Sequence, residues 1–321
     1  MTATEAGHHV LEPVYAGYFA DPFAWRSGEA YYVIGTGQTE AEGGTDKAMN
    51  VFPMLRSRDF VSWEFIGHAL KRPDASLGNN FWAPAVAESS GKFYLYYSVG
   101  HGDKHHQLRV AVSGTPEGPY EDTGTPLIPL ARCAFAIDPH PFQDTDGRWY
   151  LFYAQDFLDQ KCETRVGTAL VAAPLENMVK LGPEPATILR ARWDWQRFEA
   201  NRLMYGSRWD WHTLEGPCVW LHEGKYYCFY SGGRWENETY GVDYATASSV
   251  LGPYNDSAVA SGARVLRSGQ GGLIGPGHNT IVTGPRGIEY IVFHAWDKGM
   301  TKRQMHAARL TWTEHGPIVQ L

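Results

Sequence analysis

The chain has 321 residues, of which 43% are hydrophobic, 14% aromatic and 20% charged, and its formal net charge is -7. The hydrophobic fraction supports a folded core and excludes a disordered chain, and the negative charge argues against nucleic acid and anionic membranes as partners. The 35 glycines and 19 prolines predict many tight turns, which is typical of an all-β protein.

The N-terminal segment, MTATEAGHHVLEPVY, lacks the basic start and the apolar stretch of a secretory signal. No part of the chain approaches the roughly 20 apolar residues of a membrane span. The four cysteines fit neither a metal-binding pair nor a dense disulfide framework: Cys133, Cys162, Cys218 and Cys228. We therefore expect reduced thiols and a cytoplasmic location.

Five segments share a glycine followed by a strand of alternating aromatic residues. In chain order they read SGEAYYVIG, SGKFYLYYS, DGRWYLFYA, EGKYYCFYS and RGIEYIVFH. Their glycines, which recur at intervals of 56 to 77 residues, are Gly28, Gly91, Gly147, Gly224 and Gly287. Each segment is rich enough in β-branched and aromatic residues to form a strand.

A second short strand precedes each of these glycines, and it opens with a small or acidic residue, beside proline in most copies. The five copies contain YFADPFAW, FWAPAVAE, AIDPHPFQD, LEGPCVWLH and GPGHNTIVTG. One residue in each copy lies seven to nine positions before the glycine, and we expect these five to be structurally equivalent: Asp21, Ala83, Asp138, Glu215 and His278.

Most units continue into a third strand and a turn, as in LRVAVSGTPEGPY and VGTALVAAPLENM. Antiparallel units repeated five times at about 60 residues predict an all-β, five-bladed β-propeller that forms a single domain over residues 1–321. A β-sandwich also has closely spaced strands, but it does not predict this period.

The first strand of each propeller blade lines the central axis, so Asp21, Asp138, Glu215 and His278 are expected to meet at one end of it. Carboxyl groups held close together raise one another's pKa, which can provide one proton donor and one ionised acceptor. An Asp-Pro pair can also simply open a turn. Three acids in register favour a catalytic site, because a buried acid cluster is costly without a use.

The ordered motifs FADPF, WAPAV, AIDPHPF, LEGPCV and GPGHN, spread from about Tyr15 to Trp312, resemble those of glycoside hydrolase family 43. The resemblance implies a five-bladed propeller. It also implies that Asp21 is the general base, Glu215 the general acid, and Asp138 the residue that orients the acid and tunes its pKa. An inverting mechanism follows, with the Asp21 and Glu215 carboxyls roughly 6.5 to 9.5 Å apart.

The resemblance further implies that His278 faces a metal, often Ca²⁺, held otherwise by water. A histidine that is hydrogen-bonded to Asp138 or water is the alternative, since calcium prefers oxygen ligands. Arg303 is similar to an arginine that binds a substrate hydroxyl in this family.

Aromatic side chains are expected to pack on the apolar faces of sugar rings, and Trp82 and Phe135 lie close in sequence to the predicted site. The segment RWDWQRFEANRLMYGSRWDW repeats the sequence RWDW and explains the longest interval. We expect it to form a pocket rim carrying Trp195 and Trp211, or else a local hairpin. The histidines of the loop HGDKHH are expected at the rim or in solvent.

The resulting hypothesis is an inverting exo-glycosidase that removes terminal pentoses from arabinose- or xylose-containing plant-cell-wall oligosaccharides. An α-L-arabinofuranosidase, a β-xylosidase or an enzyme with both activities fits the motifs. An endo-arabinanase and a non-catalytic sugar-binding propeller remain alternatives, and the oligomeric state is open.

Overall fold

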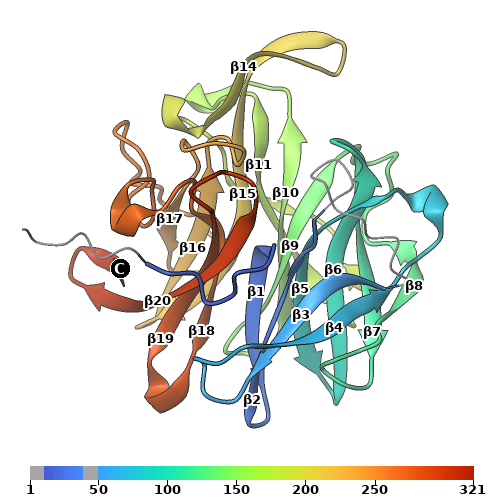
Figure 1. Cartoon of the computed structure of the whole chain (residues 1–321). Helices are drawn as coiled ribbons and strands as arrows, with labels where there is room; N and C mark the ends of the chain where they lie inside the picture. Colours follow the sequence, from blue (N-terminus) through green and yellow to red (C-terminus); the bar gives the residue numbers. More distant parts are fainter. Residues whose placement is uncertain (1–10, 39–49) are drawn as a thin grey trace, which may run out of the picture.

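The strands form antiparallel groups that follow one another around a central axis in the computed structural model, which describes residues 11–38 and 50–321 (Figure 1). The first blade comprises β1 (Ala20–Ser27), β2 (Ala30–Thr36), β3 (Asn50–Ser57) and β4 (Glu64–Lys71). The second comprises β5 (Asn80–Ser89), β6 (Lys92–His101), β7 (Lys104–Ser113) and β8 (Glu121–Pro126). The fifth comprises β18 (Gly277–Thr283), β19 (Glu289–Trp296), β20 (Arg303–Thr313) and β21 (Gly316–Gln320).

The third and fourth blades are joined into one sheet of nine strands. The third consists of β9 (Ala136–Gln143), β10 (Trp149–Phe157), β11 (Gly167–Glu176), β12 (Lys180–Leu181) and β13 (Ala186–Leu189). The fourth consists of β15 (Ser207–His222), β16 (Lys225–Gly232) and β17 (Gly241–Ala247), and β14 (Arg197–Met204) pairs with the first half of β15. The two blades connect because Gly167 and Thr168 of β11 pair in parallel with β15.

The helices in the described ranges are short 3-10 turns between strands. They are η2 (Ala75–Leu77), η3 (Lys161–Glu163), η4 (Asp194–Gln196), η5 (Gln270–Gly272) and η6 (Pro285–Gly287). None of them is long and apolar enough to cross a membrane. The five repeat glycines all have positive φ in the turns between the first two strands of their blades, as the sequence pattern predicts.

Five hydrophobic cores lie between neighbouring blades. The aromatic second strands supply much of this packing: Tyr97 lies between blades one and two, Tyr96 between two and three, Tyr230 between three and four, and Phe293 between four and five. The fifth core joins blade five to blade one through Met305 and its neighbours. One core per interface is the packing of a closed ring, so the predicted five-bladed propeller is confirmed. The single-domain organisation stays a prediction.

Backbone hydrogen bonds from the N-terminal segment to blade five help to close the ring. Val14 N–H donates to Met305 O and Phe19 N–H donates to Arg303 O, both at 2.9 Å. The chain therefore runs along β20, the third strand of blade five, before it enters blade one.

Every inner strand carries a β-bulge, and the register shift of each strand pair falls at the same point of the blade. One residue at each bulge has a positive φ between 47° and 58°: Asp21, Ala83, Asp138, Gly216 and His278. The residue that follows is proline in four blades, and the five are Pro22, Pro84, Pro139, Pro217 and Asn279. The five bulge residues with positive φ are therefore the structurally equivalent positions of the five blades.

The predicted equivalence of Glu215 with the other four residues is therefore wrong by one position, and Gly216 takes that place. The reason is steric. A Cβ at Gly216 would lie 3.1 Å from Cγ of His278, which is a tight contact, so the close approach of blades four and five favours glycine at the bulge.

Backbone N–H groups at three bulges donate to a side chain from the second strand of the preceding blade. The pairs are Ala83 with Thr36 Oγ1 (2.8 Å), His278 with Ser231 Oγ (2.8 Å), and Asp21 with His294 Nδ1 (3.0 Å). These bonds tie each bulge to its neighbouring blade and thereby fix the residues that the bulges aim at the axis.

Candidate active site

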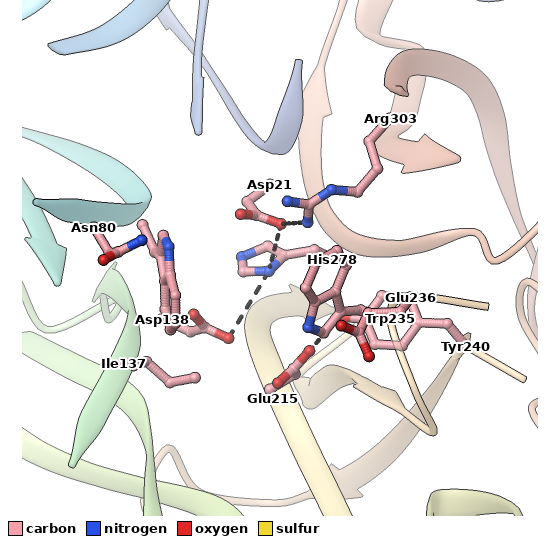
Figure 2. Close-up of a pocket in the computed structure, with 11 residues that line it drawn as sticks. Asp21, Asn80, Ile137, Asp138, Glu215, Trp235, Glu236, Tyr240, His278 and Arg303 are labelled. Carbon is pink, nitrogen blue, oxygen red and sulfur yellow. Dashed lines mark hydrogen bonds and ion pairs between the residues drawn. The ribbon is translucent and has the colours of Figure 1, made fainter. Parts of the chain in front are cut away.

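A cavity of about 370 Å³ opens at the bulged ends of the inner strands (Figure 2). Its walls include the three predicted acids and His278, Trp82 and Arg303. Among the described residues, the lining consists of Asp21, Asn80, Trp82, Ile137, Asp138, Glu215, Trp235, Glu236, Tyr240, His278 and Arg303. Residues from all five blades therefore meet in one pocket.

Asp21 is surrounded by nitrogen atoms from blade five. Its Oδ1 lies 3.3 Å from Nη1 of Arg303, 3.3 Å from Nδ1 of His294 and 3.4 Å from Nδ1 of His278. Burial alone would raise the pKa of Asp21, but His278, Arg303 and His294, with a hydrogen bond from Thr36, lower it to about 2. Asp21 is thus ionised across the physiological pH range.

Asp138 and Glu215 lie in a different electrostatic environment. Asp138 Oδ2 accepts a hydrogen bond of 2.9 Å from Gly216 N–H. Glu215 Oε1 accepts one of 2.7 Å from the Tyr240 hydroxyl (Figure 2). Burial and the charges of Glu215 and Asp21 raise the pKa of Asp138 well above its usual value. Burial is also the main cause that raises the pKa of Glu215 to about 7.

The three carboxyls therefore provide an ionised acceptor and a protonated donor in the same pocket at mildly acidic and neutral pH. General acid and base catalysis requires this combination, because one group must take a proton while another gives one.

Arg303 is held by contacts of its guanidinium with two aromatic residues. Its Cζ lies 4.4 Å from the ring centroid of Trp235 and 5.6 Å from that of Tyr18, and Nη2 donates to the Tyr18 hydroxyl at 2.7 Å. Trp235 is itself stacked on Trp296, with the planes 12° apart. This support holds the charge of Arg303 against Asp21.

Comparison with known proteins decides the family. The model for glycosyl hydrolases family 43 matches residues 10–318. The chain belongs to this family.

Relatives with assigned activities match the family 43 chain over most of its length. The β-D-galactofuranosidase XynD of Aspergillus niger is 28% identical, with 98% of this chain and 85% of the relative covered. The extracellular exo-α-(1→5)-L-arabinofuranosidase ArbA of Cellvibrio japonicus is 26% identical, with 86% of this chain and 78% of the relative covered. A crystal structure of a thermostable family 43 glycoside hydrolase is 27% identical with a TM-score of 0.81, and the match covers 97% and 96% of the two chains.

Trp82 forms a pocket wall in this family 43 chain, and a histidine of the HGDKHH loop supports it. His106 stacks on Trp82 with ring centroids 3.8 Å apart, and Phe135 makes a T-shaped contact with the His106 ring, with the centroids 5.5 Å apart. The expected rim or solvent position is wrong for His106, whose side chain is fully buried. Its Nε2 donates to Gly102 O at 2.8 Å. Burial lowers the pKa of His106 to about 4, so the ring is neutral at physiological pH. Phe135 lies behind the wall and does not line the pocket.

The predicted role of Trp211 as a substrate-binding residue does not fit its position. Its side chain is buried, it packs against Tyr205, and it lies beneath the guanidinium of Arg202, with 5.9 Å from Cζ to the ring centroid. The segment with the RWDW repeat forms the β14–β15 hairpin, as the alternative predicts. Trp211 anchors this hairpin, because its side chain is almost fully buried.

Five pocket residues were not predicted from the sequence. Asn80 and Ile137 are close neighbours of Trp82 and Asp138, so proximity in sequence could have indicated them. Trp235, Glu236 and Tyr240 come from the connection between β16 and β17, which has no counterpart in the repeat. Only the folded chain brings that connection to the axis.

A calcium ion at His278 would find few protein ligands. Nδ1 of His278 faces the carboxylates of Asp21 and Asp138 at 3.4 and 3.8 Å. Within residues 11–38 and 50–321 there is no group of three or more histidine, cysteine, aspartate or glutamate side chains that could hold a metal. Calcium takes six to eight oxygen ligands, so the residues present do not fit it by themselves. The calcium prediction stays untested.

Proposed function

We propose that this protein is an exo-acting glycosidase that removes terminal α-L-arabinofuranosyl units, and also β-xylosyl units, from short oligosaccharides. The observation that carries the proposal is the pairing of ionised Asp21 with protonated Glu215 in one pocket. The cavity of about 370 Å³ is at the small end of the ligand-site range, which suits one or two sugar units better than a polymer. The predicted cytoplasmic location stays a prediction.

The proposed reaction is a single displacement. The Asp21 carboxylate takes a proton from a water molecule as the water oxygen bonds to the anomeric carbon. At the same time the bond from that carbon to the leaving oxygen breaks, and Glu215 gives its proton to that oxygen. Asp138 keeps the acid oriented and contributes to the electrostatics of the pair. Inversion at the anomeric carbon follows, because water attacks opposite the leaving group.

Terminal β-D-galactofuranose is a second candidate substrate. The Aspergillus niger relative, which is named as a β-D-galactofuranosidase, matches nearly the whole chain. This sugar has the ring stereochemistry of α-L-arabinofuranose with one additional exocyclic carbon, so a single pocket shape can distinguish the two only through contacts to that carbon.

Release of 4-nitrophenol from the α-L-arabinofuranoside, the β-xyloside and the β-D-galactofuranoside tests the proposal. We expect the arabinofuranoside to be the best substrate and Asp21→Ala to reduce kcat by roughly 10²–10⁴-fold. Glu215→Ala should lose far more activity on an arabino-oligosaccharide than on the nitrophenyl substrate, because nitrophenolate leaves without protonation.

Several outcomes would overturn this assignment. Activity that survives in both variants would place the chemistry elsewhere. A wild-type protein that binds these sugars without cleaving them would be a sugar-binding propeller, and internal cleavage of linear arabinan would make it an endo-arabinanase. Proton NMR of the first product anomer tests inversion, and retention would exclude the single displacement.

A further inference from the structure

The two copies of RWDW, residues 192–195 and 208–211, come together around a second cavity of about 290 Å³. It lies beside the start of β14 and the first half of β15, next to the segment that enters β11. Among the described residues, none lines both this cavity and the axial pocket. The second cavity is therefore a separate site.

Positive charge predominates in this cavity, although the chain as a whole has a net charge of -7. Its wall contains three arginines, Arg165, Arg197 and Arg208, against two aspartates, Asp194 and Asp210. Such an excess on an acidic protein favours a ligand with a negative charge, and a guanidinium can bind a carboxylate through two parallel hydrogen bonds.

The charged groups differ in how firmly they are held. Arg165 Nη2 lies 3.3 Å from Asp194 Oδ1. Arg208 Nη1 donates to Asn201 O at 2.9 Å, while Asn201 N–H donates to Asp210 Oδ1 at 3.0 Å. Arg197 has no ion pair within the ranges that the structure describes, so its guanidinium is available to a ligand.

A buried histidine in the same wall has an unused acceptor. His212 is 3% exposed, and its Nδ1 donates to Asp210 O at 3.0 Å, which leaves Nε2 as an acceptor. Nε2 has no hydrogen-bond partner in the described part of the chain and lies 3.9 Å from Asp194 Oδ1. Two acceptors this close suit two adjacent hydroxyl groups, because each hydroxyl has one hydrogen and can donate it to one acceptor. The exposed side chain of Asp194 can move to admit them.

The wall also carries an aromatic surface. Trp209 is half-buried, and its Nε1 donates to Met204 O at 3.1 Å, which fixes the indole in place. An indole face, the available guanidinium of Arg197 and acceptors for hydroxyl groups in one cavity are complementary to a sugar that carries a carboxylate.

We propose that this second cavity binds a hexuronic acid unit of the glycan. The arginines would hold the carboxylate, and His212 Nε2 and Asp194 would each accept a hydrogen from one of two adjacent hydroxyl groups. The link to the glycan rests on the proposed glycosidase function. If the same glycan also carries the terminal sugar cut in the axial pocket, this site raises the local concentration of that sugar.

Calorimetric titration of the whole protein with trigalacturonate tests the proposal without any turnover. We expect binding that weakens with salt, and a loss of affinity of about tenfold or more in Arg197→Gln/Arg208→Gln. Arg58→Gln, which removes an exposed arginine from blade one, should bind like the wild type. Arg197→Lys should retain only part of the affinity, because an ammonium keeps the charge but not the two parallel hydrogen bonds. Thermal melts verify that the variants are folded.

Two comparison ligands identify the chemistry. Titration with xylotriose, which has no carboxylate, should show no binding heat that depends on Arg197 and Arg208. Inorganic phosphate should bind more weakly than trigalacturonate. Equal affinity for phosphate would reduce the site to a general anion site and overturn the sugar assignment. No arginine-dependent binding of trigalacturonate would overturn the proposal entirely. These binding results can be interpreted even if the protein has no glycosidase activity, because the titration requires no turnover.

Discussion

Residues of the same chemical type have different ionisation in this pocket because their neighbours differ. Asp21 has Arg303 and two histidines within 3.4 Å of Oδ1. Glu215 has a hydroxyl donor instead, and burial raises its pKa. The division into an ionised and a protonated carboxyl thus follows from which blade supplies the neighbouring nitrogen atoms.

Activity should depend on pH through these two groups. With the pKa of Asp21 at about 2 and that of Glu215 at about 7, kcat/KM should fall above pH 7 as the acid loses its proton, and at low pH as the base gains one. Arg303→Gln should move both limbs to higher pH, because Arg303 lowers both pKa values, whereas Arg303→Lys should move them less. Rate profiles for the three proteins test this, and a downward shift of the alkaline limb in Arg303→Gln would contradict it.

The raised pKa of Glu215 also lowers the stability of the folded protein. The window runs from pH 4.5, the ordinary pKa of glutamate, to about pH 7. In it the folded state holds a proton that the unfolded state releases, so the free energy of unfolding falls as pH rises. Glu215→Gln should remove that dependence and stabilise the protein at pH 8 by up to about 3 kcal/mol. Urea denaturation at pH 5 and pH 8 measures both effects; an equal change at the two pH values would exclude this cause.

At the scale of elements, the bulges of the inner strands carry the site. Each places one residue at positive φ, and bonds from the preceding blade hold three of the five. The conformation is costly for residues with a Cβ, by about 1–2 kcal/mol each, so the fold accepts strain at Asp21, Asp138 and His278 to aim them at the axis.

Gly216→Ala should be more harmful than the same change at another glycine with positive φ. At Gly224 (φ 75°) a Cβ meets nothing within 4 Å, so only the backbone cost of about 1–2 kcal/mol applies. At Gly216 (φ 56°) it would press on the ring of His278, which adds roughly 1–3 kcal/mol and displaces a pocket residue. Urea denaturation and kcat of both variants test the comparison, and equal effects would show that the contact with His278 is unimportant.

At the scale of the whole molecule, five interface cores form a closed ring. The last core, between blades five and one, includes Met305, which is fully buried, together with Phe19 and Val33 of blade one. No blade is packed independently of its neighbours, so the loss of one interface should weaken all of them.

Met305→Ala should therefore lower the stability of the entire chain. We expect a cost of about 2–5 kcal/mol and a single calorimetric transition in both the wild type and the variant. Ile318→Ala, at an exposed position of blade five, serves as the control and should cost little. Two separate transitions would contradict the prediction that the chain forms one domain.

The sequence by itself determined the fold and the three acids, because the repeat and its motifs are local patterns that recur at a readable interval. The position of Gly216, the burial of Trp211 and the support that His106 gives Trp82 depended on register and packing between blades, which no single segment encodes. Trp235, Glu236 and Tyr240 reach the pocket from a connection outside the repeat. Tertiary structure alone decided these contacts, because the pocket exists only where the ring of blades closes.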